Sequence, residues 1–476
     1  MSQSQQTPLC VDLDGTLTPT NSILELGIRS LKKNPFRIFD LLAKSSISKA
    51  AVKERIGQYS AQEPLHLPYN KELLAWLTKE HQKGRPLILA TASDMAVATK
   101  VAQELGIFQE VIASTRTKPI NASSKYTVLQ KRFGEKGFSY AGNSREDLSV
   151  WNIAASAIIV DAPKDVAAIV QKQMSVEAMF ASKEPLSLEI ILKEIRIHQW
   201  LKNLLLFIPA IAAHAALQGP VILHAIIGFI SFSLFASSVY VFNDIMDISS
   251  DRLHRTKHVR PIAAGKLSIG EAGILGISLA TISVALALFA LPISFTLIIG
   301  LYAGINIVYS LWAKKIPYLD IGILAGLYVL RIIAGSAATG IETSTWLFLF
   351  AGCFFLNLAI VKRITEIVAL KNNEEMAHGR GYGKRDKNVL TGIGAICAAL
   401  ACVVLAFYIT SASVMRLYTT PSILWIIVPA LIVWIARIWR LALHKKLPDD
   451  PVLFASKDAT SYLLVAIMAA SMLLAT

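Results

Sequence analysis

The sequence predicts a chain of two parts: an N-terminal α/β domain and a C-terminal, all-helical domain that crosses a membrane several times. Charged residues are scattered through residues 1–190, as in soluble proteins, and short apolar segments there end in carboxylates and hydroxyls. After Gln199 the chain becomes a series of apolar runs that are long enough to span a bilayer. The segment Met1–Pro8 is polar, so no signal peptide is expected.

The first strand of the α/β domain is expected at Pro8–Val11, directly before Asp12–Thr16. Two carboxylates at the end of a strand, with a glycine turn behind them, are typical of an active site. Asp12 can attack a phosphorus atom, and Asp14 lies on the same side of the chain and can act as general acid and base. A polar turn without chemistry has the same pattern, so the prediction depends on the rest of the domain.

Three other segments supply groups that such a site needs. A second buried strand, Pro86–Ala90, ends in Thr91, whose hydroxyl can hold a phosphate oxygen. Lys118 and Lys125 offer a cation, and Lys125 is the better candidate because it opens a helix-like run. Asp147 follows another strand and adds a carboxylate. The combination predicts a site for a phosphate group.

Together these segments resemble the four motifs of the haloacid dehalogenase (HAD) phosphatase superfamily, over about residues 8–175. The resemblance implies a Rossmann-like α/β fold that uses Mg²⁺. It implies these roles: Asp12 as nucleophile, Asp14 as acid and base, Thr91 and Lys125 as phosphate ligands, and Asp12, Asp14 (by its carbonyl) and Asp147 as metal ligands. Asn143 stands where the family commonly has Asp. Asn is a neutral and weaker ligand, which predicts reduced metal affinity or turnover.

The segment from Asn21 to about Lys79 is helix-like and rich in Lys and Arg, and it matches the small helical cap of HAD phosphatases. Its basic residues Arg29, Lys32 and Lys33 predict an anionic or membrane-bound substrate, although a solvated helix face explains them equally well. The expected organisation is a HAD-like domain at 1–180 with its cap at about 21–80, a linker or interfacial segment at 181–200, and a transmembrane domain at 201–476.

Nine membrane spans are predicted, of which the first is the weakest because Pro209 interrupts it. They lie near residues 202–218, 221–243, 270–290, 292–312, 318–340, 345–362, 389–411, 421–440 and 459–475. Most Lys and Arg residues of the loops follow the even-numbered spans, and the opposite loops offer only Arg416. This asymmetry predicts that the α/β domain is cytoplasmic. The expected location of this multi-pass protein is the inner or plasma membrane of a bacterium. Membrane orientation and phosphate binding explain the net charge of +14, so no nucleic-acid partner is expected.

Oxygen-bearing side chains cluster after the second span. The cluster has helical spacing, which stacks its members on one face over two turns: Asn243, Asp244, Asp247 and Asp251. Such a face can hold Mg²⁺, which takes a few carboxylates and draws its other ligands from phosphates and water. Lys257 and Arg260, just downstream, can then bind the phosphate oxygens. The alternative is a solvated loop after a helix that happens to be acidic.

The segment Asn243–Gly265 resembles the first Asp-rich motif of the UbiA superfamily of intramembrane prenyltransferases. This resemblance implies about nine transmembrane helices around a cavity that opens to the cytoplasm, with Mg²⁺ holding a diphosphate. Arg196–Asn203, Ala236–Asp244 and Arg260–Gly265 further resemble the polyprenyl-phosphate phosphoribosyltransferase branch, of the decaprenyl-phosphate phosphoribosyltransferase type. This branch moves ribose 5-phosphate from phosphoribosyl diphosphate to a polyprenyl phosphate. The resemblance implies that the first two of these segments contribute substrate-binding residues: Lys202, Asn203 and Tyr240.

A second Asp-rich motif, which aromatic prenyltransferases of the superfamily carry after the fourth span, is incomplete here. The region contains Asp320 without a second carboxylate in the next turn. Arg331 inside the fifth span, and Lys362 and Arg363 at the end of the sixth, add positive charge instead. A surface ion pair between Arg363 and Glu366 is the simpler explanation for part of this cluster. One metal and many cations suit two phosphate-bearing substrates.

The sequence therefore predicts a bifunctional, Mg²⁺-dependent membrane enzyme of cell-wall precursor synthesis. Its helical domain transfers 5-phosphoribose to a polyprenyl phosphate, and its HAD domain removes the 5-phosphate from the lipid product. One alternative is prenyl transfer from a polyprenyl diphosphate to an aromatic acceptor, with a phosphatase of unrelated substrate. Another is a transporter that uses Asp and Arg pairs for ions. A homo-oligomer is compatible with the sequence.

Overall fold

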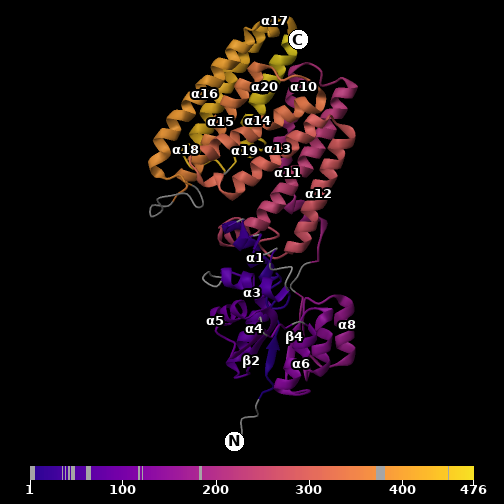
Figure 1. Cartoon of the computed structure of the whole chain (residues 1–476). Coiled ribbons are helices and arrows are strands. Elements are labelled where there is room, and N and C mark those ends of the chain that lie inside the picture. The colour runs from indigo at the N-terminus through magenta and orange to yellow at the C-terminus, as the bar shows by residue number, and fades with distance from the viewer. Residues whose placement is uncertain are drawn as a thin grey trace. The chain divides into compact units, whose positions relative to one another are not determined.

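The computed structural model describes residues 6–34, 36–37, 39–40, 43, 49–60, 66–115, 118–120, 122–181, 185–370, 381–448 and 450–476 (Figure 1). They belong to two compact units. The first unit comprises residues 1–195 and 240–276, and the second comprises residues 196–239 and 277–476. The α/β domain lies in the first unit, and most of the apolar helices lie in the second.

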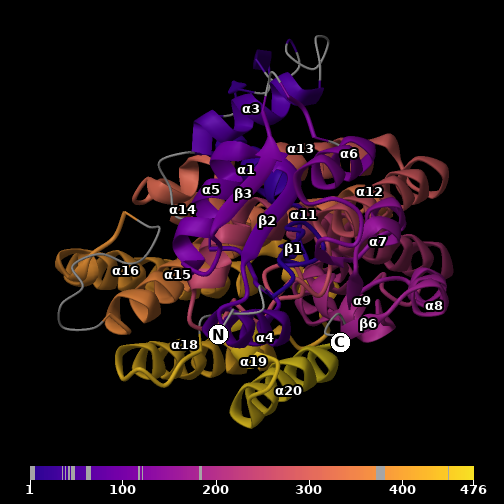
Figure 2. The ribbon, with the colours of Figure 1, turned by 90° about the horizontal axis from the view of Figure 1, so that it is seen from below.

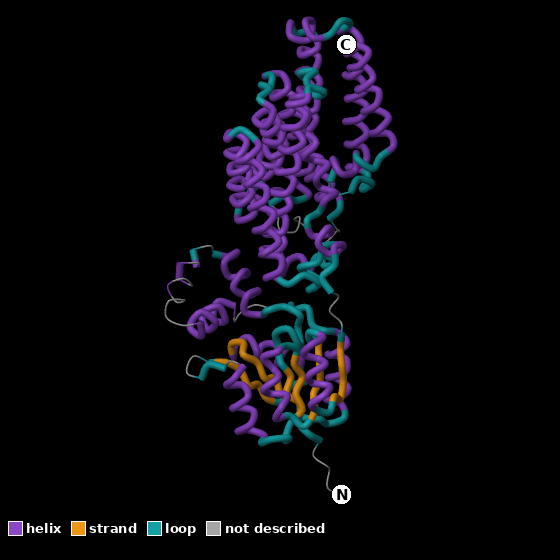
Figure 3. Tube along the Cα trace, turned by 90° about the vertical axis from the view of Figure 1, so that its right-hand side faces the viewer, coloured by secondary structure: helices purple, strands orange, loops and turns teal. Residues whose placement is uncertain are grey.

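A six-stranded parallel sheet forms the centre of the α/β domain, in the order β3-β2-β1-β4-β5-β6 (Figure 3). The strands are β1 (Leu9–Val11), β2 (Leu87–Asp94), β3 (Glu110–Ser114), β4 (Ser139–Gly142), β5 (Ser156–Val160) and β6 (Val176–Phe180). Leu9 pairs with Leu87 of β2 on one side and with Ser139 of β4 on the other. Parallel strands end at the same edge of a sheet, so the residues that follow β1 and β4 meet there.

Both faces of the sheet are buried, as a parallel sheet covered by helices requires. Alternate residues of each strand enter different clusters: Leu9 and Val11 lie in one core, and Cys10 lies in the other. The first core also takes residues of the cap and of α5 (Met95–Leu105), whereas the second takes residues of α6 (Ala122–Phe133) and α7 (Leu148–Ile153). Figure 2 shows α5 on one side of the strands and α6 and α7 on the other.

Three helices form the described part of the cap, between β1 and β2: α1 (Ser22–Lys33), α3 (Lys49–Ser60) and α4 (Lys71–Gln82). Side-chain caps fix two of their starts, because the Asn21 carbonyl oxygen accepts from the Leu24 amide and that of Asn70 accepts from the Leu73 amide. The remaining helices before the apolar region are η1 (Arg145–Asp147), α8 (Lys164–Gln173) and α9 (Leu188–Glu194).

The regular elements of the apolar region are helices. In the described residues of this region, seven helices are long and apolar enough to cross a membrane. The helices are η2 (Ile197–Phe207), α10 (Ile208–Ala212), α11 (Gly219–Leu253), α12 (Ile269–Ala290), α13 (Ile293–Leu311), η3 (Ala313–Lys315), α14 (Leu319–Thr339), α15 (Thr345–Val368), η4 (Lys384–Asp386), α16 (Lys387–Ile409), α17 (Ala412–Leu417), η5 (Pro421–Ile426), α18 (Ile427–Leu443), α19 (Pro451–Ala455) and α20 (Ala459–Ala475). Large apolar side chains such as Ile274 and Phe289 are exposed, as lipid-facing residues are.

The fold class is as predicted, but the prediction of nine spans is wrong in one detail. The first predicted span, 202–218, is not one helix: a 3₁₀ helix, η2, is followed by the short helix α10, and Pro209 lies in the first turn of α10. Proline fits the first turn of a helix but cannot continue a preceding one, so the chain changes helix type there. The ninth predicted span is α20, an apolar helix of 17 residues.

The second unit brings η2 and α14 into close contact through a glycine. A Cβ atom on Gly335 would lie 2.0 Å from the Leu206 carbonyl oxygen, so only glycine fits this approach. The contact places the segment around Asn203 beside the polar residues of α14. A single apolar core then joins α14, α15, α16 and α18, with Phe355, Ile360 and Trp434 among its members.

Candidate functional sites

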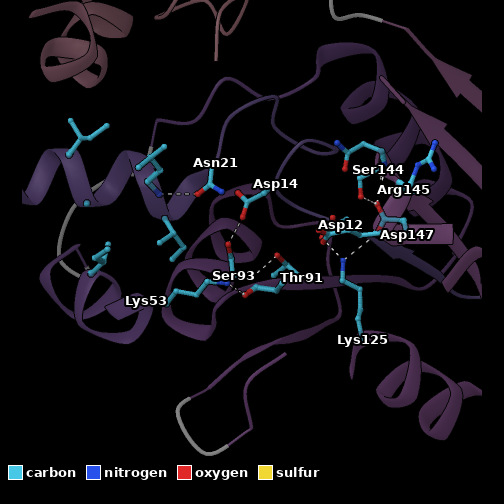
Figure 4. Close-up of a pocket in the computed structure, with 18 of the residues that line it drawn as sticks. Asp12, Asp14, Asn21, Lys53, Thr91, Ser93, Lys125, Ser144, Arg145 and Asp147 are labelled. Carbon is cyan, nitrogen blue, oxygen red and sulfur yellow. Dashed lines mark hydrogen bonds and ion pairs between the residues drawn. The ribbon is translucent and has the colours of Figure 1, made fainter. Parts of the chain in front are cut away.

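The carboxyl end of β1 carries a buried triad of charged groups (Figure 4). The Lys125 ammonium, from α6, lies 3.0 Å from Asp12 Oδ1 and 3.6 Å from Asp147 Oδ1. Asp12 follows β1, and Asp147 ends η1 after β4. These three residues are far apart in the sequence, and the structure brings them together as the sequence predicted. Thr91 lines the same pocket, but β2 continues to Asp94, so Thr91 lies inside the strand and not at its end.

Burial and charge act against each other in this triad. Burial raises the pKa of the Asp12 carboxyl to about 7, although the Lys125 ammonium lowers it. Burial alone would lower the pKa of Lys125, but the charges of Asp12 and Asp147 raise it above its usual value. Lys125 therefore stays cationic, and its charge favours the ionised, nucleophilic form of Asp12.

The side chain of Asp14 points toward the cap and not toward Lys125 (Figure 4). Its Oδ1 accepts a hydrogen bond from the Ser22 amide at 2.7 Å, at the start of α1, and its Oδ2 accepts one from the Ser93 hydroxyl. The two carboxylates of the motif thus have separate partners. Asp12 faces the cation, and Asp14 stands between the sheet and the cap, where a general acid can reach the leaving group.

Two residues that sequence reasoning missed hold this site in place. Tyr140 accepts from Lys125 at 2.8 Å and donates to Asp147 Oδ1 at 2.7 Å. Ser93 donates to Asp14, and its amide donates to the Thr91 hydroxyl at 3.0 Å. The available signal was only their position: Tyr140 lies three residues before Asn143, and Ser93 lies two after Thr91. A buried hydroxyl near a site residue can have any of several roles. Its position in the sequence is therefore weak evidence that it belongs to the site.

Asn143, the departure from the family pattern, lies within the same site. Its side-chain oxygen accepts from the Thr16 hydroxyl at 3.2 Å, and a Cβ on Gly15 would meet its side-chain nitrogen at 2.3 Å. Gly15 has a φ of 83°, a conformation that also favours glycine. The Asn143 amide therefore packs directly against the loop that carries Asp12 and Asp14.

The donor set suits a hard divalent cation. Asp12 and Asp147 offer carboxylate oxygens, which Mg²⁺ prefers. Asp147 Oδ2 accepts from the amides of Asn143 and Ser144, both at 3.1 Å, which fixes its orientation. Within the described parts of the chain, no three His, Cys, Asp or Glu side chains are grouped as a complete metal site. A cation here would need water or substrate phosphate as further ligands.

A pocket of about 820 Å³ opens above these residues and extends along the cap. Two of the cap's basic residues have partners away from it: Arg29 donates to the Ser249 hydroxyl, and the Lys32 ammonium lies 2.6 Å from Asp247. None of Arg29, Lys32 and Lys33 lines the pocket. These side chains leave α1 on another face than the one that lines the pocket, so the pocket gives no support to a role for them in substrate choice.

At the Asp-rich end of α11, one arginine links two carboxylates that are close in the sequence. Arg260 Nη1 lies 2.9 Å from Asp244 and 2.5 Å from Asp251, and both carboxylates are buried. Asp247 is more exposed and pairs with Lys32. Asn243 is half-buried, as is Tyr240, and Lys257 is close enough to Asp251 to interact with its charge. The predicted face is thus present, and Arg260 neutralises two of its members. The side chains of Asn243, Asp244, Asp247 and Asp251 offer oxygen donors, the type that Mg²⁺ takes.

In the second unit, the predicted cations of the helical domain all have partners. Lys202 forms an ion pair with Asp450, and Lys362 is close enough to both for electrostatic interaction. Arg331 is buried and donates to the Asn203 side-chain oxygen at 2.9 Å. Asn203 in turn donates to Ser233 at 2.9 Å. The sequence singled out these cations but did not identify Asp450 as a partner.

Asp320 and Arg363 form a second buried pair. Arg363 Nε lies 2.7 Å from Asp320 Oδ2, as an ion pair and not as an aligned hydrogen bond, and Tyr382 donates to Asp320 Oδ1 at 2.7 Å. Arg363 also contacts Glu366 at 2.6 Å. The expected pair of Arg363 with Glu366 therefore forms, but the simpler explanation of a surface pair is wrong because Arg363 is fully buried.

Residues 204–473 match the model of the UbiA prenyltransferase family, so the chain belongs to this family of membrane transferases. The chain is 31% identical to the uncharacterized protein y4nM of Sinorhizobium fredii, over 98% of this chain and 91% of that protein. It is 35% identical to decaprenyl-phosphate phosphoribosyltransferase of Corynebacterium glutamicum, over 37% of this chain and 54% of that protein. A substrate-bound phosphoserine phosphatase structure is similar over 40% of this chain and 99% of that chain, with 11% identity and a TM-score of 0.27. The chain is an integral membrane protein, and its family is the one that the sequence predicted.

Proposed function

We propose that the helical domain, about residues 201–476, transfers 5-phosphoribose from phosphoribosyl diphosphate to a polyprenyl phosphate. The buried state of Asp320 carries this proposal. Arg363 and Tyr382 engage both of its carboxylate oxygens, so it is poorly placed to hold a second Mg²⁺ with a prenyl diphosphate. Similarity to decaprenyl-phosphate phosphoribosyltransferase supports the same reading.

The residues of the proposed transferase site divide into two groups. Asn243, Asp244, Asp247 and Asp251 would hold Mg²⁺, which when bound stabilises negative charge on the departing diphosphate. The others would bind phosphate oxygens: Lys202, Asn203, Tyr240, Lys257, Arg260, Arg331, Lys362 and Arg363. Arg260 would exchange a carboxylate partner for substrate, because its side chain is the most exposed of the Asp244–Arg260–Asp251 cluster. The lipid phosphate is anionic at neutral pH and needs no strong general base.

In our proposal the α/β domain, about residues 1–180, then removes the 5-phosphate from the lipid product. Asp12 attacks phosphorus and forms an aspartyl phosphate, while Asp14 protonates the departing ribose oxygen. Asp14 next takes a proton from the water that cleaves the aspartyl phosphate. Thr91 and Lys125 hold phosphate oxygens, and Asp147, with Asp12 and the Asp14 carbonyl, would bind Mg²⁺. The loop charges favour a cytoplasmic α/β domain at a bacterial inner membrane.

Substrate exchange tests the transferase proposal. Membranes that contain the protein would receive Mg²⁺, labelled phosphoribosyl diphosphate and a polyprenyl phosphate, and a parallel reaction would receive a polyprenyl diphosphate with labelled 4-hydroxybenzoate. We expect label to enter the lipid fraction in the first reaction alone. Label in lipid only from the aromatic reaction would overturn the phosphoribosyl proposal.

A further inference from the structure

We propose that the pocket of the α/β domain binds a phosphate monoester whose alcohol carries an apolar chain, and that α1 recognises this chain. The inference rests on the proposed phosphatase and specifies its substrate class. It starts from one face of α1, which lines the pocket with five residues: Ile23, Leu24, Gly27, Ile28 and Leu31. Their spacing of i, i+1, i+4, i+5 and i+8 places them in one stripe. The stripe is about 12 Å long, at 1.5 Å per residue.

The stripe begins at the catalytic end of the pocket. The amide of Ser22, one residue before Ile23, donates to Asp14 at 2.7 Å. A phosphate held beside Asp12 and Thr91 therefore has its leaving group directed toward the first turn of α1. In this proposal the rest of that group follows the stripe along α1.

Helix α3 adds a further apolar residue beside the stripe. Ile56 of α3 lines the pocket, and a Cβ on Gly27 would come within 3.3 Å of its side chain. Lys53 is the cation that α3 adds, and its ammonium donates to the Ala92 carbonyl at 3.1 Å. The cap therefore lines the pocket mainly with hydrocarbon, and the Lys53 ammonium is held by the backbone of β2.

Part of the stripe has no role in the domain core. Leu26, on another face of α1, is 1% exposed and belongs to the core, whereas Leu24 is 44% exposed. Among the residues that the structure describes, neither Leu24 nor Ile28 forms or packs against that core. Exposed apolar side chains that line a pocket beside a reactive site indicate an apolar ligand. A chain such as that of a polyprenyl lipid has this character, and ribose 5-phosphate alone does not.

Alkylphosphonates, which cannot be hydrolysed, test this inference through binding alone. Ethyl-, butyl- and hexylphosphonate would be titrated calorimetrically into the full-length protein in detergent. Burial of one methylene is worth up to about fourfold in affinity, so we expect hexylphosphonate to bind at least about 10-fold more tightly than ethylphosphonate. Equal affinity for the two would overturn the inference.

Substitutions in α1 test whether this helix causes the preference for the longer alkyl chain. We expect Leu24→Gln and Ile28→Gln to reduce the hexyl-to-ethyl ratio to within about threefold, because each replaces pocket hydrocarbon with an amide. Lys33→Gln, on the same helix but outside the pocket, should leave the ratio unchanged. A ratio that survives both pocket variants would contradict the role of α1. Phosphate release from hexyl phosphate, measured in parallel, separates the two proposals: chain-dependent binding without hydrolysis would overturn the phosphatase and leave the recognition intact.

Discussion

The two regions proposed to bind phosphate groups are assembled in different ways. In the α/β domain, Asp12, Lys125 and Asp147 come from distant parts of the sequence, and the parallel sheet brings them to one edge. At the end of α11, Asp244, Asp251 and Arg260 lie within 17 consecutive residues, and a helix with the turn after it is enough to gather them. The first region depends on topology, and the second depends on helical spacing.

The two regions also hold their cations differently. Lys125 is buried between its carboxylates and further bound by Tyr140, so it is a fixed part of the site. Arg260 bridges its carboxylates from a side chain that is 26% exposed. A fixed cation suits repeated binding of one phosphate group, and a more exposed one suits exchange between protein carboxylates and a large diphosphate substrate. The following predictions test this difference.

The largest effect is expected at the nucleophile. Asp12→Asn should lower phosphatase activity by about a thousandfold or more, because the amide cannot form the aspartyl phosphate. Phosphoribosyl transfer should be unchanged, since Asp12 pairs with Lys125, whereas Asp244 of α11 pairs with Arg260. Phosphate release from a small chromogenic phosphate and label transfer to lipid would be measured on the same preparation. Loss of both activities would show that the two regions do not act independently.

A smaller but still large effect is expected at the α11 carboxylates. Asp244→Asn or Asp247→Asn should lower lipid labelling by about 100-fold to 1,000-fold, as loss of a group that stabilises leaving-group charge does. Glu271→Gln provides a matched control, because Glu271 accepts from Ser268 at the start of α12 and lies outside the Asp-rich cluster. Full transfer activity in detergent-stable Asp244 and Asp247 variants would show that this face does not hold the catalytic metal.

Replacing Asn143 with Asp, the residue common at this position in HAD phosphatases, should increase the Mg²⁺ affinity of the α/β site. Asn143→Asp adds a charged oxygen beside Gly15 and the Asp12 loop, and charged ligands hold Mg²⁺ more tightly than amides. We expect the Mg²⁺ concentration for half-maximal phosphatase activity to fall by about 10-fold. An unchanged or higher requirement would show that position 143 does not contact the cation.

The smallest effect concerns acid stability of the α/β domain. Burial raises the pKa of Glu177, but hydrogen bonds from Arg85, Ser156 and Ser139 outweigh it and lower the pKa from 4.5 to about 2. A lowered carboxyl pKa stabilises the fold above about pH 4.5, and this stability is lost as the pH falls toward 2. Because Glu177 is partly exposed, the loss should be no more than about 1 kcal/mol. Acid unfolding followed by tryptophan fluorescence should show this loss in the wild type and not in Glu177→Gln.

The sequence predicted the two fold classes and the members of the α/β triad, because both follow from local patterns. Strand ends with carboxylates indicate a site, and a parallel sheet leaves one edge for them to meet. Tyr140 and Ser93 were missed because a hydroxyl becomes a site residue only through its neighbours in space. The Arg363–Asp320–Tyr382 contacts join three separate segments, which sequence spacing does not relate. The first span was predicted as one apolar run, although Pro209 marks a change of helix type.

The sequence also did not indicate which face of α1 lines the pocket. Its basic residues are conspicuous in the sequence, but Arg29 and Lys32 contact residues after the second predicted span. Its apolar residues read as ordinary helix core. The position of the pocket, and not the composition of the helix, distinguishes Leu24 and Ile28 from Leu26.

The central claim, that the two regions act in sequence on one lipid, is tested most directly by the lipid product itself. Wild-type and Asp12→Asn proteins would be supplied with Mg²⁺, phosphoribosyl diphosphate and a polyprenyl phosphate, and the extracted lipids would be compared by mass spectrometry. We predict a polyprenyl-phosphoryl ribose from the wild type, and from Asp12→Asn the same lipid with one additional phosphate. The same product from both proteins would contradict the coupling.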